Sequence, residues 1–135
     1  IHIGQMDTSV GAGIAGKENV EGTWVHGYVQ TPLPEKIKSW QARYTKKHGE
    51  WNATSIDFVN PAYAFVAAVK KAQSLDPKKI TEALRTVEFE NLWGKAHFGG
   101  KDYYGIGNQI IYPMPFSEVK DGVAHLVVQL TPPHN

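Results

Sequence analysis

The chain has 135 residues, with 14 lysines and arginines against 13 aspartates and glutamates, six histidines and no cysteine. This length suits one compact domain, and a net charge of +1 argues against a general binder of nucleic acid or membrane surfaces, because both need a concentrated basic face. The lack of cysteine excludes disulfides, thiol nucleophiles and cysteine-based zinc sites. No apolar run reaches the roughly 20 residues of a membrane span, so we expect no membrane insertion.

The N-terminal region is predicted to combine a loop with a strand. Residues 1–3 are apolar and could end a strand, whereas 4–19 are rich in glycine and small polar residues, which is typical of a loop. Within 23–29 the apolar residues favour a second strand, with Gly27 inside it. The chain begins with Ile1 rather than methionine, from which we expect either that a segment was cleaved away or that this is a piece of a longer protein.

Residues 11–16 read Gly-Ala-Gly-Ile-Ala-Gly and match the dinucleotide-binding pattern GxGxxG. That pattern binds pyrophosphate only where a strand precedes it and a helix opens on it. Residues 5–10 are mostly polar loop formers, and 17–21 offer no room for a helix before the next strand. We therefore favour a turning loop over a nucleotide site, and we expect no cofactor.

Three helices are predicted in the middle of the chain. The first spans 33–48, where apolar residues recur at spacings of four, three and four before the cationic end at Gly49. The second begins near Asn60-Pro61 and is apolar on nearly every side over 62–69, which predicts neighbours on more than one face. The third begins at Asp76-Pro77, a capping residue followed by proline at the first helical position.

The C-terminal part is predicted to be an ordered loop followed by a β-hairpin. Residues 88–107 have no clear period and contain five glycines. Two β-rich runs follow at 109–116 and 123–130, and Asp121-Gly122 between them favours a tight hairpin turn. Two prolines, at 113 and 115, predict that the first of these strands is bent or lies at an edge.

Catalytic and metal motifs are weak in this sequence. No histidine stands three or four residues from another, and no serine lies in GxSxG, so we predict neither a metal site nor an enzyme. Trp40 lies on the stripe of a predicted helix and is expected in the core. Trp51 and Trp93 lie in predicted loops, where they either cap a core or line a ligand site.

Several features come in an order that resembles a known family. Lys47-His48-Gly49 closes a helix, Ala62-Tyr63-Ala64 lies in an apolar helix, and Gly94 precedes Phe98 in a loop. This series resembles the C-terminal third of the type I periplasmic solute-binding proteins, the group that includes the leucine/isoleucine/valine-binding protein. Members run well over twice this length, so the resemblance implies an incomplete C-terminal fragment.

The resemblance implies an α/β fold of two Rossmann-like three-layer lobes, in which residues 1–27 and 107–130 supply second-lobe and hinge strands. Residues 33–90 would supply first-lobe helices. The implied function is capture of a small ligand between the lobes, for delivery to the membrane permease of an ABC transporter. Such a protein is periplasmic, is no enzyme and needs no cofactor.

The resemblance also implies ligand-binding residues. Asp7 is the candidate partner of a ligand ammonium group, in a loop that it shares with Gln5 and Met6, and Phe58 is the candidate aromatic facing the cleft. Packing of Phe58 into the core is the competing interpretation. A branched-chain or other hydrophobic amino acid is the expected ligand. Aromatic acids and short amides remain open, as does a standalone, small oligomeric interaction domain.

Overall fold

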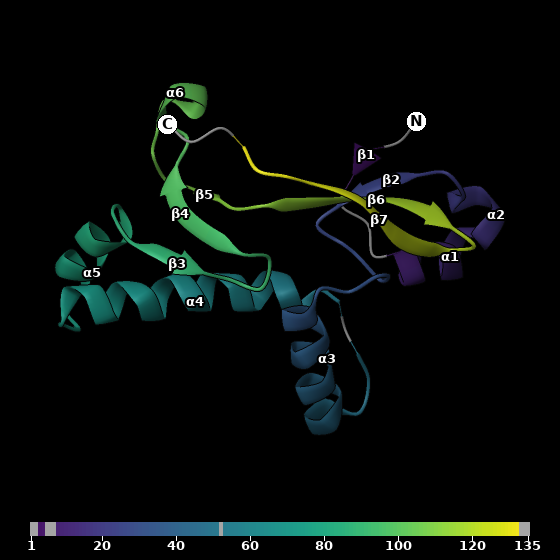
Figure 1. The fold of residues 1–135 in the computed structure, drawn as a ribbon, viewed down its shortest axis with the longest axis horizontal. Coiled ribbons are helices and arrows are strands. Elements are labelled where there is room, and N and C mark those ends of the chain that lie inside the picture. Colours follow the sequence, from purple (N-terminus) through teal and green to yellow (C-terminus); the bar gives the residue numbers. More distant parts are fainter. Residues whose placement is uncertain (1–2, 5–7, 52, 133–135) are drawn as a thin grey trace. The chain divides into compact units, whose positions relative to one another are not determined.

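The computed structural model describes residues 3–4, 8–51 and 53–132. The described part contains six helices and two small sheets, which confirms a mixed α/β fold (Figure 1). The chain divides into two compact units. The first comprises Ile1–Thr54 with Met114–Leu130, and the second comprises Ser55–Pro113 with Thr131–Asn135. The assignment of segments to two lobes stays a prediction.

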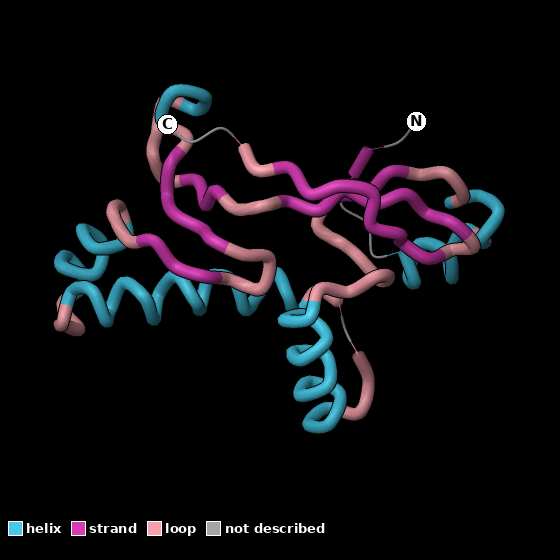
Figure 2. The backbone as a smooth tube through the Cα atoms, in the orientation of Figure 1, coloured by secondary structure: helices cyan, strands magenta, loops and turns pink. Residues whose placement is uncertain are grey.

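The first unit is built on a four-stranded sheet. Its strands are ordered β1 (Ile3–Gly4), β2 (Trp24–His26), β6 (Met114–Lys120) and β7 (Val123–Leu130). β1 runs parallel to β2, whereas β2, β6 and β7 pair antiparallel (Figure 2). The core of this unit joins buried side chains from the sheet and from the helices before it: Val20, Val25, Val119 and Ala124.

The predicted loop over 4–19 is wrong, because two helices occupy most of it: α1 (Thr8–Ala15) and α2 (Lys17–Val20). Ala12 of α1 and Val20 of α2 pack in the core of the first unit, and Gly16 separates the helices with a φ of 91°. Burial against the sheet thus overrides the weak helix propensity of this glycine-rich stretch. The GxGxxG pattern begins at the fourth residue of α1 rather than at its N-terminus. Only the backbone N–H groups of the first helical turn lack partners within a helix, and most N–H groups of the pattern lie beyond that turn.

The first predicted helix is confirmed as α3 (Glu35–His48). It ends at Gly49, which has a φ of 88° and whose N–H donates to the Thr45 carbonyl. Ile37 is the buried residue of the helix, whereas Trp40 and Tyr44 on the same stripe are half-buried. The expectation that Trp40 lies fully in the core is therefore met only in part.

The second unit contains the other two predicted helices, α4 (Ser55–Ala72) and α5 (Pro77–Leu84). α4 begins five residues before the predicted start, so that Pro61 lies inside the helix. The start of α5 is confirmed, since the Asp76 side chain accepts hydrogen bonds from the backbone N–H groups of Lys78 and Lys79 at 2.8 and 3.2 Å.

One face of α4 packs and another stays open within this chain. Ala64 and Ala68 are buried against α5, whereas Phe65 and Val66 are 53% and 49% exposed. The expectation that neighbours cover this helix on more than one face is therefore not met by the residues that the structure describes.

The predicted loop over 88–107 is also wrong. It contains β3 (Glu88–Glu90), β4 (Lys95–Gly99) and the single-turn α6 (Lys101–Tyr104), and β3 and β4 form an antiparallel sheet with β5 (Gln109–Ile111) in the order β3-β4-β5. Phe89 and Ala96 are neighbours in this sheet and pack with the helices of the second unit. The strands are too short for a period to stand out in the sequence.

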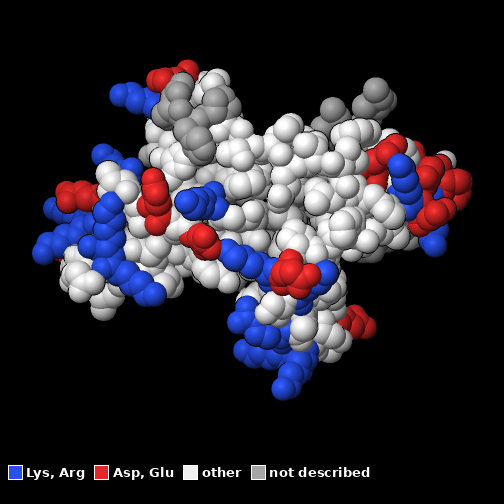
Figure 3. Space-filling view, viewed as in Figure 1, with Lys and Arg blue, Asp and Glu red and all other residues white. Residues whose placement is uncertain are grey.

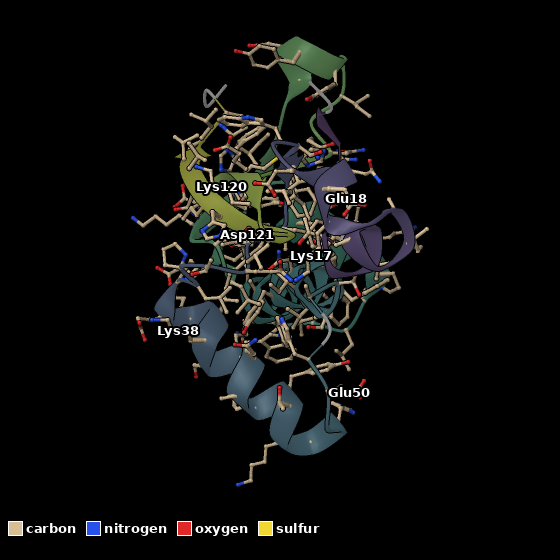
Figure 4. All side chains as sticks on the ribbon, turned by 90° about the vertical axis from the view of Figure 1, so that its right-hand side faces the viewer. Lys17, Glu18, Lys38, Glu50, Lys120 and Asp121 are labelled. Atoms are coloured by element: carbon tan, nitrogen blue, oxygen red, sulfur yellow. The ribbon has the colours of Figure 1, made fainter. Side chains whose placement is uncertain are left out.

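The predicted strand over 109–116 divides at Pro113 into β5 and β6, which confirms a bend. β6 is no edge strand, since it lies between β2 and β7, with a bulge between Phe116 and Ser117. The tight turn before β7 is confirmed, because Asp121 and Gly122 have φ values of 54° and 76°. A side chain at Gly122 would meet the stem of Lys17, which lies beside this turn (Figure 4).

Candidate functional site

The candidate site lies at the carboxyl ends of β1 and β2, the two parallel strands of the first sheet. We call this place the carboxyl edge. Ile3 pairs with Trp24 and Gly4 with Val25, so the carboxyl ends of β1 and β2 reach the same edge. Ligands of open α/β sheets bind outside such carboxyl ends. The chain leaves β1 at Gly4 and enters α1 at Thr8. The residues between them, Gln5, Met6 and Asp7, lie outside the described residues, so their ligand contacts stay predictions.

The start of α1 is anchored by a buried hydroxyl. Thr8 is 1% exposed, and its Oγ1 donates to Oε1 of Gln30 at 2.6 Å. The same Gln30 oxygen accepts the backbone N–H of Ala124 in β7 at 3.1 Å. Three segments far apart in the sequence thus meet where the chain enters α1. Nothing in the sequence pattern marks Thr8 or Gln30 for this role.

The segment after β2 is held against β7 as well. The backbone N–H groups of Gln30 and Thr31 both donate to the Ala124 carbonyl, and the Thr31 carbonyl accepts from Leu126. The buried Ser117 hydroxyl donates to the Tyr28 carbonyl at 2.9 Å. These bonds anchor both the segment that follows β2 and the start of α1, on either side of the carboxyl edge.

Phe58 lies in the first turn of α4 and is 82% exposed. Packing of Phe58 into the core is therefore wrong within this chain. An exposed aromatic ring is free to meet a ligand, but Phe58 belongs to the second unit and the loop 5–7 to the first. Its role in a shared site stays a prediction.

A buried polar cluster in the second unit joins α4 to the turn between β3 and β4. The Asn60 side-chain oxygen accepts the backbone N–H of Leu92 at 3.4 Å. The Asn91 oxygen accepts the N–H groups of Trp93 and Gly94 at 2.8 and 3.0 Å. Trp93 is 6% exposed, so of its two expected roles burial favours the core. The cluster therefore serves as structure for the turn.

Trp51 is half-buried beside the end of α3. Its ring meets the ring of Tyr44 edge-on, with centroids 5.6 Å apart. Such a pair stabilises the chain locally, so capping of the helix end accounts for Trp51 without a ligand.

Tyr112 is the residue of the second unit whose ionisation links to stability. Burial, and then the negative charge of Asp57, raise the pKa of Tyr112 above its usual value of 10.0. The folded protein thus favours the neutral phenol. Its contribution to the free energy of unfolding is complete below pH 10 and is lost as the pH rises through the raised pKa. We expect Tyr112→Phe to reduce the alkaline loss of stability in urea titrations between pH 9 and 12. Tyr103→Phe, at an exposed tyrosine, is the control, and equal pH profiles for both variants would contradict the assignment.

The described residues contain neither a metal-binding cluster nor a membrane-spanning helix. Within the described ranges, no three histidine, cysteine or acidic side chains are placed to hold a metal ion. No helix among these residues has the length and apolar character that crossing a membrane requires. The carboxyl edge of β1 and β2 is a candidate place for binding because ligands of open α/β sheets bind outside the carboxyl ends of strands.

Comparison with known proteins gives the family. Residues 4–124 match the family model described as periplasmic binding protein. The chain belongs to the periplasmic binding protein family. This confirms the resemblance seen in the sequence, and the family consists of solute-binding proteins rather than enzymes.

Solved structures of periplasmic binding proteins share the fold at low identity. A branched-chain amino acid ABC transporter ligand-binding protein from Burkholderia xenovorans is 16% identical, with a TM-score of 0.74 over 96% of this chain and 36% of that one. A leucine-, isoleucine-, valine-, threonine- and alanine-binding protein from Brucella ovis, in a closed conformation, is 18% identical, with a TM-score of 0.67 over 94% and 35%. A solute-binding protein from R. palustris in complex with benzoate is 13% identical, with a TM-score of 0.66 over 90% and 33%. The chain therefore spans about a third of the length of these proteins.

Proposed function

We propose that this chain is part of the solute-binding component of an ABC transporter, which captures a small ligand in the periplasm. The observation that carries the proposal is the family match, which extends over 121 of the 135 residues, from 4 to 124. The carboxyl edge of β1 and β2 supports it, because that is where an α/β sheet offers a loop to a ligand. Hinge closure of two lobes over the ligand would then give the permease a distinct loaded form to recognise.

The ligand that we propose is a branched-chain or another hydrophobic amino acid. In this account the Asp7 carboxylate binds the ligand ammonium group, and Gln5 and Met6 line the same loop. A carboxylate withdrawn from water needs a charged or hydrogen-bonding partner, and an ammonium group supplies both. This ligand class is supported by the names of two similar proteins: the Burkholderia protein is named as a branched-chain amino acid ABC transporter ligand-binding protein, and the Brucella protein as an amino-acid-binding protein.

An aromatic acid or a short amide is the alternative. The R. palustris protein bound benzoate, and the exposed ring of Phe58 would suit a flat ligand. Benzoate has no ammonium group, so Asp7 would then lie outside the cleft. The two proposals therefore differ in the role of Asp7, which binds the ligand if the ligand is an amino acid and does not bind it if the ligand is an aromatic acid.

A standalone oligomeric domain is the second alternative, favoured by the exposed apolar face of α4. Phe58, Phe65 and Val66 lie on this face and are all at least 49% exposed. If they met a second copy, sedimentation of the 135-residue chain would show a dimer at micromolar concentration. A monomer would exclude this alternative.

A thermal-shift panel on the full-length protein tests the ligand class. We expect leucine, isoleucine or valine to raise the melting temperature, because a ligand at 100 times its Kd adds about 2.7 kcal/mol to the free energy of unfolding. Benzoate and a short aliphatic amide are the comparison compounds. A shift with benzoate alone would contradict the amino-acid proposal and favour the aromatic alternative.

A further inference from the structure

The net charge of +1 conceals an uneven distribution of charge along the chain. α3 contains five of the 14 lysines and arginines and one of the 13 acidic residues, Glu35. The rest of the chain is therefore net acidic. Figure 3 shows lysine and arginine side chains gathered over α3. A concentrated basic face, which the overall charge seemed to exclude, is thus present on one helix.

Four of these cations lie on one side of the helix. At 3.6 residues per turn, Lys36, Arg43, Lys46 and Lys47 fall within an arc of about 100°. All four are exposed. The fifth, Lys38, lies on another side and pairs with Glu35 at 2.6 Å. We call the four residues the basic stripe.

Only some of the cations in the basic stripe lie where a positive charge stabilises the helix. Lys46 and Lys47 lie in the last turn, where cations interact favourably with the helix dipole. Lys36 lies in the first turn, where the dipole disfavours a cation. Arg43 stands four residues before Lys47, a spacing at which like charges repel by a few tenths of a kcal/mol. The helix dipole therefore accounts for Lys46 and Lys47 but not for the whole stripe.

An aromatic ridge supports the basic stripe along its flank. It consists of Tyr44 and the three rings that Tyr44 contacts, those of Trp40, His48 and Trp51, with centroids 6.4, 4.6 and 5.6 Å from its own. The Arg43 guanidinium lies over the Trp40 ring, 5.5 Å from its centroid. Contacts of this kind restrict the arginine and the helix end, and a restrained cation loses less entropy when it binds a partner.

We propose that the basic stripe docks an acidic protein surface, which, given the proposed function, belongs to the permease of the transporter. Charge complementarity is the basis: four exposed cations on one rigid helix face suit a row of carboxylates. A helix that binds lipid buries an apolar face in the membrane. No large apolar side chain of α3 is highly exposed among the residues that the structure describes, which favours a protein over a lipid partner.

The test compares variants of the full-length protein for binding to the permease in nanodiscs of neutral phosphatidylcholine. Lys46→Glu/Lys47→Glu reverses two charges of the stripe. Lys36→Gln/Arg43→Gln neutralises the other two without placing negative charge in the last turn of α3, where the helix dipole disfavours it. The control is Lys78→Glu/Lys79→Glu, an equal change at exposed lysines of α5. We expect both stripe variants to bind at least about tenfold more weakly, with a smaller salt dependence, and the control to bind like the wild type.

The outcomes separate this inference from the proposed function. Ligand affinity, measured by calorimetry on the same variants, is expected to stay unchanged. Normal ligand binding together with unchanged permease affinity in the stripe variants contradicts the inference alone, as does an equal loss in the control. A wild-type protein that binds no small ligand contradicts the proposed function, and this inference with it. Charge-dependent binding to phosphatidylglycerol vesicles without permease would contradict a protein partner and show that the basic stripe binds anionic lipid instead.

Discussion

Replacing Asp7 with asparagine in the full-length protein is expected to weaken amino-acid binding by about 30-fold to several thousand-fold. The reason is that truncating one partner of a desolvated charge pair costs about 2–5 kcal/mol, since the other charge is left without a counter-ion. Asparagine is the better choice than alanine, because Asp7 directly precedes α1 and both residues are favoured as helix caps. Isothermal titration calorimetry with leucine, isoleucine or valine measures the change.

The matched control is Asp76→Asn. Asp76 caps α5 through the N–H groups of Lys78 and Lys79, so the same substitution is made at another helix start, outside the candidate site. We expect the control to leave ligand affinity within twofold of the wild type. Unchanged amino-acid binding in Asp7→Asn would show that the ammonium group is held elsewhere, and a ligand without an ammonium group would then be the better candidate.

Replacing Ile37 with alanine is expected to lower the free energy of unfolding by about 2–5 kcal/mol. Ile37 is 0% exposed, and a truncated buried side chain loses its transfer free energy and leaves a cavity. Urea denaturation of the full-length protein gives the change from the shift in midpoint at constant m-value. Ser39→Ala, at an exposed position of the same helix, is expected to change stability by less than about 0.5 kcal/mol. A loss below about 1 kcal/mol for Ile37→Ala would contradict the burial of this residue.

The elements with local signals were predictable from the sequence. α5 begins at a capping aspartate followed by proline, and α3 ends at a glycine with positive φ. The turn at Asp121-Gly122 has both residues at positive φ. In each case a few neighbouring residues determine the backbone, so a short stretch of sequence contains the information.

The elements that were missed depend on distant partners. α1 has two internal glycines and forms because Ala12 reaches the core that strands β2, β6 and β7 complete. β3 and β4 have three and five residues, and Phe89 and Ala96 are buried against the helices α4 and α5. Tertiary packing overrides local propensity in both places.

The candidate ligand-binding residues stay predictions. The loop 5–7 and Phe58 came from the resemblance to a family, which this chain is now known to join. The anchor of α1 was invisible, because Thr8 and Gln30 are 22 residues apart and Gln30 and Ala124 are 94 apart. A hydrogen bond between segments that distant leaves no pattern in a single sequence.

Direct titration of the full-length protein with leucine, isoleucine and valine tests the central proposal, that this family member captures a branched-chain or another hydrophobic amino acid. We expect saturable binding of one ligand per protein for at least one of them, with a negative heat-capacity change as apolar surface is buried. Circular dichroism of the same sample establishes that the protein is folded. A folded protein that binds none of the three, and whose melting temperature none of them raises, would contradict the proposal.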